Sequence, residues 1–350
     1  MAALFFGEDD GGLGELFKMV GNGGLGKFNI VVQFNAVEAF TLFPDLVQDL
    51  QPGGIGQGLG DLFRSFCVHL RHMGSLVTVS LISPVIGCKI HKLRYMNFNL
   101  SQIPERTARP RSEGLTMIND KGLSIVEARN LISGASPYVD IVKLAFGTSI
   151  VTPDLREKIK VYQDAGVAVY FGGLLFEAFV IRNQFNDFVN MLQDYAITYI
   201  EVSDGSIDIP HGEKCGYIEK LAKYGVVLSE VGSKDKDREH ITPPYRWIQL
   251  MKAELDAGAS YIVAEARETG TVGLYRNSGE VREGLVQEIL TKVPAGKIIW
   301  EAPQKDQQLY FLSLIGANAN LGNINPSEVI ALEAMRIGLR GDSFNFYLKK

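Results

Sequence analysis

Eight short apolar runs, rich in β-branched residues, recur between residues 114 and 324 and alternate with longer amphipathic stretches. They cover residues 114–119, 139–147, 167–173, 197–203, 226–232, 261–267, 297–303 and 319–324. Nearly continuous apolar strands between helices indicate a parallel sheet covered on both faces. Eight such units in this length favour a (β/α)8 barrel over a doubly wound open sheet, and no nucleotide-binding fingerprint follows the first run.

The stretches between these runs have the pattern of amphipathic helices. Residues 152–166 and 176–195 are two of them, and the second places Phe176, Phe179, Val180 and Gln184 on one face. Glycines at 166, 225 and 258 each follow a helical stretch and precede a strand, as helix stops do. Asn325 and Pro326 are expected to be the N-cap and first residue of the last helix.

Residues 1–95 differ from the remainder of the chain. They contain 15 of the 37 glycines but only 7 of the 35 lysines and arginines, and their apolar residues keep no lasting period. The GxGxxG spacing of Gly21, Gly23 and Gly26 follows no convincing strand, and a dinucleotide site requires that context. We therefore expect an irregular, glycine-rich extension at 1–95 and a catalytic barrel at 96–350. Met96 begins a stretch that resembles the start of a natural protein. We therefore interpret residues 1–95 as an extension translated from sequence upstream of the usual start.

An uncharged stretch, residues 73–88, lies within this extension and is followed by basic residues. It is shorter than the roughly 20 residues that span a bilayer, and it contains Pro84. No membrane attachment is predicted from it.

Charge and cysteine content narrow the class of protein. The formal net charge is −5, which argues against a general nucleic-acid binder. Cys67, Cys88 and Cys215 are widely spaced and form neither a CxxC pair nor a disulfide framework. This pattern is typical of the reducing cytoplasm, which is the predicted location.

Four successive predicted strands carry a glutamate near their ends: Glu201, Glu230, Glu265 and Glu301. Their separations of 29, 35 and 36 residues equal the length of a β/α unit. A carboxylate in an apolar strand costs several kcal/mol unless it is paired or bound to a metal. Since the carboxyl ends of barrel strands form the active-site mouth, the glutamates are candidate ligands there. Oxygen ligands favour Mg²⁺ over zinc.

Basic residues lie near these glutamates in the sequence. Lys143 ends the second strand, Lys234 follows Glu230, and Arg267 lies two residues after Glu265. Carboxylates together with cations suit a divalent metal that holds an anionic substrate. The alternative is a charge-balanced plug of Glu–Lys and Glu–Arg pairs inside the barrel.

Motifs in almost every predicted strand resemble those of the phosphosulfolactate synthase family of coenzyme M biosynthesis. The resemblance covers about residues 100–345 and excludes the extension. It rests on DKGLS (120–124), DIVKLAFGTS (140–149), VYFGGLLFE (169–177), IEVSDGSIDI (200–209), LSEVGSK (228–234), EARETG (265–270), WEAPQKDQQ (300–308) and EAMRIGLRGD (333–342).

This resemblance implies a (β/α)8 barrel and Mg²⁺-dependent addition of sulfite to C3 of phosphoenolpyruvate, which gives (2R)-phospho-3-sulfolactate. Negative charge would build on the substrate carboxylate as an aci-carboxylate, and a general acid would protonate C2. Lys234 matches the family lysine proposed as that acid, and a lowered pKa would suit it to the task. Gly232 would let the chain turn sharply off the strand before it.

The other site residues follow from the chemistry and from their positions at the strand ends. Glu201, Glu230 and Glu265 are expected to hold Mg²⁺ or its waters, with Asp120, Glu177 and Glu301 in reserve. Lys143 and Arg267 are candidates for the substrate phosphate or carboxylate. Backbone near Gly322 and Asn323 could add to phosphate binding, although Pro326 removes one N–H there. Arg336 and Arg340 could reach phosphate, but a structural role suits them better.

Two other readings stay open at this point. A barrel lyase could use the same site with another enol phosphate or nucleophile, since fold does not fix function. Plant heat-stress-associated proteins also resemble this family, so a role without catalysis is the third reading. Self-association is expected, because barrels commonly form homo-oligomers.

Overall fold

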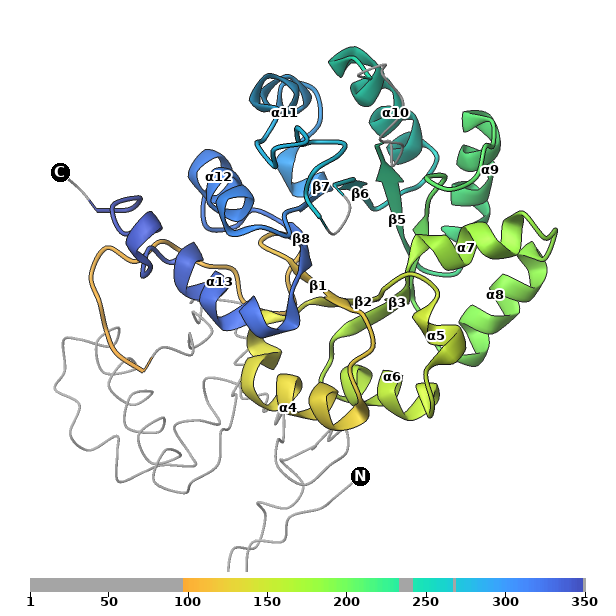
Figure 1. Cartoon of the computed structure of the whole chain (residues 1–350), viewed down its shortest axis with the longest axis horizontal. Coiled ribbons are helices and arrows are strands. Elements are labelled where there is room, and N and C mark those ends of the chain that lie inside the picture. The colour runs from red at the N-terminus through yellow and green to blue at the C-terminus, as the bar shows by residue number, and fades with distance from the viewer. Residues whose placement is uncertain (1–96, 233–241, 267–268, 349–350) are drawn as a thin grey trace, which may run out of the picture. The chain divides into compact units, whose positions relative to one another are not determined.

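The computed structural model describes residues 97–232, 242–266 and 269–348. Eight parallel strands pair in the order β3-β2-β1-β8-β7-β6-β5-β4, and β3 and β4 at the two ends are themselves in contact. The sheet thus curves into a nearly closed barrel, with the strands central and the helices around them (Figure 1). The predicted TIM barrel is confirmed, and the open-sheet alternative is wrong.

Every predicted strand is present, and its bounds differ from the predicted ones by a few residues at most. The strands are β1 (Thr116–Asp120), β2 (Ile141–Leu144), β3 (Ala168–Phe171), β4 (Tyr199–Val202), β5 (Val226–Val231), β6 (Tyr261–Ala264), β7 (Ile298–Glu301) and β8 (Leu321–Ile324). The helices of eight or more residues are α4 (Ile125–Ala135), α6 (Leu155–Asp164), α7 (Gly173–Val180), α8 (Phe185–Asp194), α9 (His211–Leu221), α10 (Pro244–Asp256), α11 (Glu283–Leu290), α12 (Lys305–Ile315) and α13 (Val329–Arg336). Shorter elements are α5 (Thr148–Val151), η2 (Ser136–Tyr138), η3 (Ala295–Lys297), η4 (Pro326–Glu328) and η5 (Gly341–Ser343).

Residues 176–195 were predicted to form one helical stretch. They form parts of two helices, so the prediction of a continuous helix was wrong. Helix α7 ends at Val180 and α8 begins at Phe185. Asn183 between them has a φ of 58°, a left-handed conformation that an α-helix cannot contain. Gln184 therefore precedes α8 and is exposed instead of sharing a face with Phe176.

Helix boundaries elsewhere follow the local chemistry of the sequence. Gly166 and Gly258 have φ values of 69° and 111°, as expected of residues that end helices. The Asn325 side chain accepts the N–H of Ser327, so this residue caps a helical segment as predicted. That segment is the 3₁₀-helix η4, which runs directly into α13.

Alternating side chains divide the core into two layers. Outward-facing strand residues pack against the helices, for example Trp300, which stacks on Phe311 of α12. A second, smaller cluster fills the barrel interior and consists of Leu115, Met117, Ile141, Tyr170, Leu228, Val263 and Ile299. Because side chains two residues apart share a face, the next inward positions toward the strand ends are those of Asn119, Lys143, Glu201, Glu230, Glu265 and Glu301. An apolar plug thus lies beneath a polar layer.

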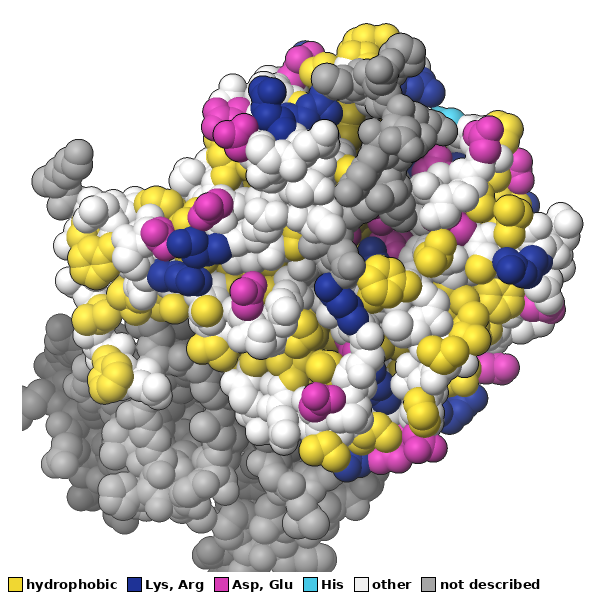
Figure 2. Space-filling view, viewed as in Figure 1, with side chains coloured by type: hydrophobic (Ala, Val, Ile, Leu, Met, Phe, Trp, Pro, Cys, Tyr) yellow, Lys and Arg dark blue, Asp and Glu magenta, His cyan; other side chains and the backbone are white. Residues whose placement is uncertain are grey.

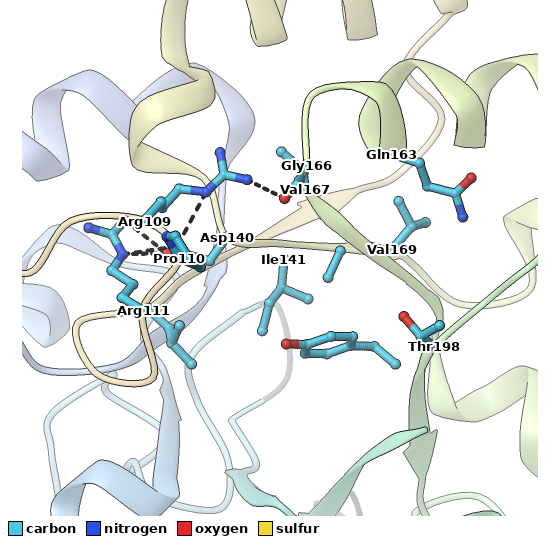
Figure 3. Close-up of a pocket in the computed structure, with 13 residues that line it drawn as sticks. Arg109, Pro110, Arg111, Asp140, Ile141, Gln163, Gly166, Val167, Val169 and Thr198 are labelled. Atoms are coloured by element: carbon cyan, nitrogen blue, oxygen red, sulfur yellow. Dashed lines mark hydrogen bonds and ion pairs between the residues drawn. The ribbon is translucent and has the colours of Figure 1, made fainter. Parts of the chain in front are cut away.

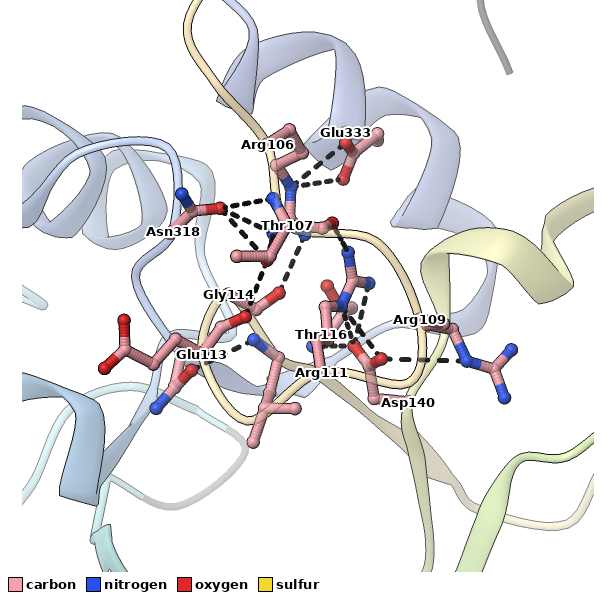
Figure 4. Close-up of polar contacts among 12 residues, drawn as sticks. Arg106, Thr107, Arg109, Arg111, Glu113, Gly114, Thr116, Asp140, Asn318 and Glu333 are labelled. Carbon is pink, nitrogen blue, oxygen red and sulfur yellow. Dashed lines mark hydrogen bonds and ion pairs between the residues drawn. The ribbon is translucent and has the colours of Figure 1, made fainter. Parts of the chain in front are cut away.

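The amino-terminal end of the barrel is closed by arginine contacts (Figure 4). Arg106 pairs with Glu333 at 3.1 Å, and Arg111 pairs with Asp140 at 2.8 Å. Arg336 is completely buried and donates to the carbonyl oxygens of Ala317, Ala319 and Leu115. The structural role predicted for Arg336 agrees with these contacts. This end of a TIM barrel characteristically supplies stability.

Within the described ranges, no helix has both the length and the apolar character needed to cross a bilayer. Residues 1–95, including the uncharged stretch 73–88 and the glycine motif, lie outside these ranges. The interpretation of that extension therefore stays a prediction.

Candidate active site at the carboxyl end of the barrel

Lys143 lies at the centre of the polar layer inside the barrel. Its Nζ is 3.0 Å from Oε1 of Glu201, 3.5 Å from Oε1 of Glu301 and 3.7 Å from Oε2 of Glu230. The Lys143 side chain is 12% exposed, and the three glutamates are 5% exposed or less. Three predicted strand-end carboxylates thus converge inside the barrel, as the spacing indicated, and they converge on an ammonium group.

The environment of Lys143 fixes its protonation state. Burial by itself lowers the pKa of this ammonium, but Glu201, the Tyr170 phenol, Glu301 and Glu230 together outweigh it and hold the pKa well above its usual range. Burial also raises the pKa of Tyr170, and the adjacent Glu201 raises it further. Both groups therefore keep their protons at neutral pH, and neither is suited to give one up during a reaction.

Glu201 is held by donors from three directions. Its Oε2 accepts the N–H of Gly173 at the start of α7, and its Oε1 contacts both Lys143 and the Tyr170 hydroxyl. A helix N-terminus favours a carboxylate because its first N–H groups lack partners within the helix. Glu201 is thereby fixed in one orientation.

Glu177, one of the reserve candidates for holding Mg²⁺, has a different role in the site. Its carboxylate on α7 accepts from the Ser203 hydroxyl and from the backbone N–H groups of Gly205 and Ser206. These contacts fold the loop that follows β4 back onto α7. Glu177 orders the rim of the mouth, a role that sequence reasoning missed.

Asp120, the second reserve, does not face the barrel interior. It accepts from Lys158 and Tyr162 of α6 and from the N–H groups of Gly122 and Leu123. Side chains alternate between the two faces of a strand, so Asp120, which follows the inward-facing Asn119, points outward to these partners. Asp120 therefore anchors the first loop to its neighbouring helix.

Glu301, the third reserve, belongs to the centre of the site. Besides its contact with Lys143, its Oε2 accepts the N–H of Ala266, the residue after Glu265. This bond links the ends of β6 and β7. It also sets the path of the chain immediately beyond Glu265.

A buried network behind β5 holds Glu230 in place. Lys214 of α9 donates to the backbone oxygen of Glu230 at 2.5 Å and pairs with Asp204 and with Glu254, each at 3.0 Å. Ser229 donates to the same Glu254 at 2.7 Å. Burial lowers the pKa of Lys214, but the two carboxylates more than reverse this and raise it. The end of β5 is thus tied to both flanking helices through charged side chains.

Gly232 stands where no side chain fits. Its φ is 151°, and an added Cβ would lie 2.4 Å from Cβ of Glu265 and 3.1 Å from the Trp247 ring. The positive φ agrees with the glycine turn predicted after β5, and the path of the chain beyond Gly232 lies outside the described residues. The close approach of Glu265 supplies a second reason for glycine that the sequence did not reveal.

Replacing Gly232 with alanine should therefore push Glu265 out of position. We expect a loss of about 1–3 kcal/mol in the free energy of unfolding and at least about a tenfold fall in kcat, because small displacements at a catalytic site are costly. Gly216→Ala, within α9 and with open space around its Cβ, is the matched control and should be neutral or slightly stabilising. A G232A protein with unchanged kcat would contradict this assignment.

Gly322 and Asn323 of β8 reach the same layer. An added Cβ on Gly322 would lie 2.6 Å from Met117 and 3.0 Å from Ile299, so this residue faces the interior. Asn323 has a φ of 59° and accepts a 2.6 Å hydrogen bond from Nδ2 of Asn119. Asn119, which sequence reasoning missed, is the residue aligned with Lys143 in the β1–β2 register. A polar residue in an apolar strand was the available signal.

Two predicted residues, Lys234 and Arg267, lie outside the described ranges. Their roles remain predictions. In the chain sequence they directly follow the ends of β5 and β6, the strands that carry Glu230 and lead to Glu265.

A cavity of about 330 Å³ lies at the opposite end of the barrel (Figure 3). Its walls come from the starts of β2, β3 and β4 and include Arg109, Arg111, Asp140 and Tyr199. Arg109 donates to the carbonyl oxygens of Ser136 and Gly166 there. Because TIM-barrel chemistry takes place at the carboxyl ends of the strands, we assign the active site to the glutamate layer and not to this cavity.

Comparison with known proteins agrees with this geometry. Residues 104–342 match the family described as (2R)-phospho-3-sulfolactate synthase (ComA). The chain belongs to the phosphosulfolactate synthase family.

Curated members of this family match at nearly full length. The phosphosulfolactate synthase of Methanothermobacter thermautotrophicus is 40% identical over 69% of this chain and 95% of its own length. The Bacillus subtilis protein of that name is 38% identical over 71% of this chain and 99% of its own. The Methanocaldococcus jannaschii protein is 41% identical over 66% and 94%, respectively. The described barrel is therefore a phosphosulfolactate synthase-family barrel.

The side chains of the polar layer determine whether a metal ion fits there. The described parts of the chain contain no group of three or more His, Cys, Asp or Glu side chains arranged to hold one. The glutamates instead surround Lys143, which resembles the alternative of an internal ionic plug. Glu201, Glu230 and Glu301 contact the one ammonium group of Lys143, and Glu265 is buried at the end of the neighbouring strand β6. Carboxylate oxygens are the donor type that a hard divalent cation prefers.

Proposed function

We propose that this chain catalyses the addition of sulfite to C3 of phosphoenolpyruvate, giving (2R)-phospho-3-sulfolactate. The observation that carries the proposal is the match to three curated phosphosulfolactate synthases over 94% or more of their length. The polar layer at the carboxyl end of the barrel supports it, because that is where TIM-barrel enzymes place their chemistry.

The charge of the site indicates what must accompany the substrates. Phosphoenolpyruvate and sulfite are both anions, and the glutamates Glu201, Glu230 and Glu301 surround the ammonium group of Lys143. Binding two anions there requires further positive charge. Lys234, Arg267 and a Mg²⁺ ion are the proposed sources.

Glu230, on β5, and Glu265, the residue after the adjacent strand β6, are the proposed main ligands of Mg²⁺. Glu201 already accepts from Gly173, Lys143 and Tyr170, so it is better suited to contact a water of the ion. When bound, Mg²⁺ would supply Lewis-acid stabilisation of negative charge on the substrate carboxylate. Lys143 holds the glutamates in place, which fits its contacts better than the substrate-binding role first assigned to it.

The proposed reaction forms one bond and transfers one proton. The sulfur lone pair of sulfite attacks C3, and the electrons of the C2–C3 double bond move toward C2 and the carboxylate. Arg267 and the Gly322–Asn323 segment would hold the anionic groups of the substrate. Lys234 would then protonate C2, since the raised pKa of Lys143 makes this described lysine of the layer a poor proton donor.

The direct test uses the full-length protein with phosphoenolpyruvate, sulfite and Mg²⁺, and follows the organic product by ³¹P and ¹³C nuclear magnetic resonance. We expect a new C–S-bonded phosphate ester, loss of turnover with a chelator, and recovery when Mg²⁺ is restored. No product under saturating conditions would overturn the proposed reaction. Turnover that survives chelation would overturn the metal assignment alone.

Self-association is a further part of the proposal. On the face shown in Figure 2, apolar side chains gather over α5 and α7, and Ile150, Val151 and Leu174 are among those exposed. The predicted homo-oligomer and the cytoplasmic location both stay predictions. Sedimentation analysis of the purified chain would decide the first.

A further inference from the structure

The pair formed by Asn119 and Asn323 has a property that the other buried amides of the barrel do not share. Asn119 is 5% exposed and Asn323 is 7% exposed, and a 2.6 Å hydrogen bond joins them across the β1–β8 seam. Oδ1 of Asn119 is buried and has no hydrogen-bond partner among the described residues. Leaving such an atom unpaired costs about 1–3 kcal/mol, so a native structure rarely keeps one without a use.

Asn320, at the other end of β8, shows what a purely structural asparagine looks like in this barrel. It is 2% exposed, its Oδ1 accepts the N–H of Leu115, and its Nδ2 donates to the carbonyl oxygens of Gly296 and Ile298. Both ends of that amide are thus satisfied by backbone. Asn119 is equally buried but is satisfied at one end only.

The position of the pair in the barrel indicates where the unpaired atom of Asn119 lies. Asn119 follows Met117 on the inward face of β1 and is aligned with Lys143 of β2, so it belongs to the polar layer of the mouth. The glutamates come from the opposite side of the layer, from β4 to β7 and the residue after β6. The layer is therefore divided into an acidic arc and an arc of neutral amides at β8 and β1.

The orientation of the two amides decides which residue of the pair offers a free donor. As the structure has them, Nδ2 of Asn119 donates to Asn323, and the unpaired Oδ1 of Asn119 is an acceptor. If both side-chain amides rotate by half a turn, one N–H···O bond still joins them. In either arrangement the pair offers one NH₂ group and one carbonyl oxygen beyond its own bond. The NH₂ group is a donor for an anionic oxygen and carries no charge that the glutamates would neutralise.

Backbone strain at Asn323 points to the same place. Its φ of 59° is uncommon for a residue other than glycine and occurs within β8, next to Gly322. Such conformations tend to be kept where they position a functional group. Here the turn brings the Asn323 amide to the interior beside Asn119.

We propose that the Asn119–Asn323 pair is a substrate-binding subsite in which both amides are turned by half a turn from their arrangement in the structure. Asn323 then donates to Oδ1 of Asn119, and Nδ2 of Asn119 takes the buried unpaired position and donates to an anionic oxygen of phosphoenolpyruvate. The inference rests on the proposed function for the identity of the substrate. Phosphoenolpyruvate is assigned to this arc instead of sulfite because TIM barrels commonly bind phosphorylated substrates near the last strands, beside the β8–β1 seam.

The test compares Asn119→Ala and Asn119→Asp with Asn320→Ala, using the full-length protein. Hydrogen bonds to charged groups give about 10- to 100-fold in affinity. We expect N119A to raise the KM for phosphoenolpyruvate about 10- to 100-fold while the KM for sulfite changes less than about threefold. N119D keeps the shape but adds a negative charge, and it should raise the same KM further. N320A should lower the melting temperature and leave both KM values unchanged.

The possible outcomes distinguish failure of the proposed subsite from failure of the proposed reaction. Folded N119A and N119D proteins with an unchanged KM for phosphoenolpyruvate would overturn the subsite, as would failure of both to fold while N320A folds. If the wild-type protein shows no turnover, calorimetric titration with phosphoenolpyruvate and Mg²⁺ separates the failures. Binding that N119A weakens would support the subsite and reject the reaction, whereas absence of wild-type binding would reject both.

Discussion

Replacing Lys143 with methionine is expected to lower the free energy of unfolding by roughly 3–5 kcal/mol and to abolish turnover. Removing one partner of a buried ionic cluster leaves its other charges uncompensated, and that is the costly case. Here Glu201, Glu230 and Glu301 would remain around an apolar side chain. Urea titration followed by tryptophan fluorescence measures the effect on the barrel alone, because both tryptophans, Trp247 and Trp300, are buried within it.

The matched control is Lys160→Met, which removes an exposed lysine paired with Asp164 on α6. Such surface pairs contribute about 0–1 kcal/mol, so this variant should unfold almost as the wild type does. A K143M protein as stable as K160M would show that the glutamates do not depend on the ammonium.

The pH dependence of the Lys143 contribution follows from the direction of its pKa shift. Because the folded pKa is raised, the stabilisation is present in full below the pKa of an unfolded lysine, about 10.4. It is lost only as the pH rises through the folded value. The stability difference between wild type and K143M should therefore stay constant between about pH 6 and 9, and a difference that shrinks within that range would contradict the shift.

Replacing Lys234 with alanine is expected to reduce kcat by roughly 10²- to 10⁴-fold, the usual contribution of a general acid, while folding is preserved. The prediction comes from the match of Lys234 to the lysine proposed as the acid in the phosphosulfolactate synthase family. The raised pKa of Lys143 agrees with it, because that lysine holds its proton too firmly to transfer it. Single-turnover kinetics with phosphoenolpyruvate and sulfite measure the loss. Circular dichroism and the melting temperature report whether the fold is retained.

Lys236→Ala is the control for Lys234, because it removes the same charge from the same segment two residues later. It should retain nearly full activity. If K234A turns over at the wild-type rate, another group delivers the proton and the assignment of Lys234 fails. If both variants lose activity equally, the segment contributes overall charge and not a specific acid.

The sequence by itself determined the architecture of the barrel. Eight apolar runs with helical stretches between them allow few arrangements, since parallel strands need crossover helices and a covered sheet. The regular recurrence of Glu201, Glu230, Glu265 and Glu301 predicted that their side chains would meet, because equivalent strand positions in a barrel face one interior. The structure brings three of them, Glu201, Glu230 and Glu301, to Lys143. The break between α7 and α8 escaped the sequence, since Asn183 in a left-handed conformation leaves no clear signal in an otherwise apolar helical pattern.

Only the tertiary structure decided which charged side chains pair with one another. Spacing places Lys143, Asp120 and Glu177 near strand ends alike, yet Lys143 lies among the inner carboxylates, Asp120 faces α6, and Glu177 holds the loop after β4. Likewise, the Asn119–Asn323 pair joins strands more than 200 residues apart along the chain. The physical reason is that periodicity specifies the face on which a side chain lies. The partner that it meets there depends on how the sheet closes, and that is determined by all eight strands together.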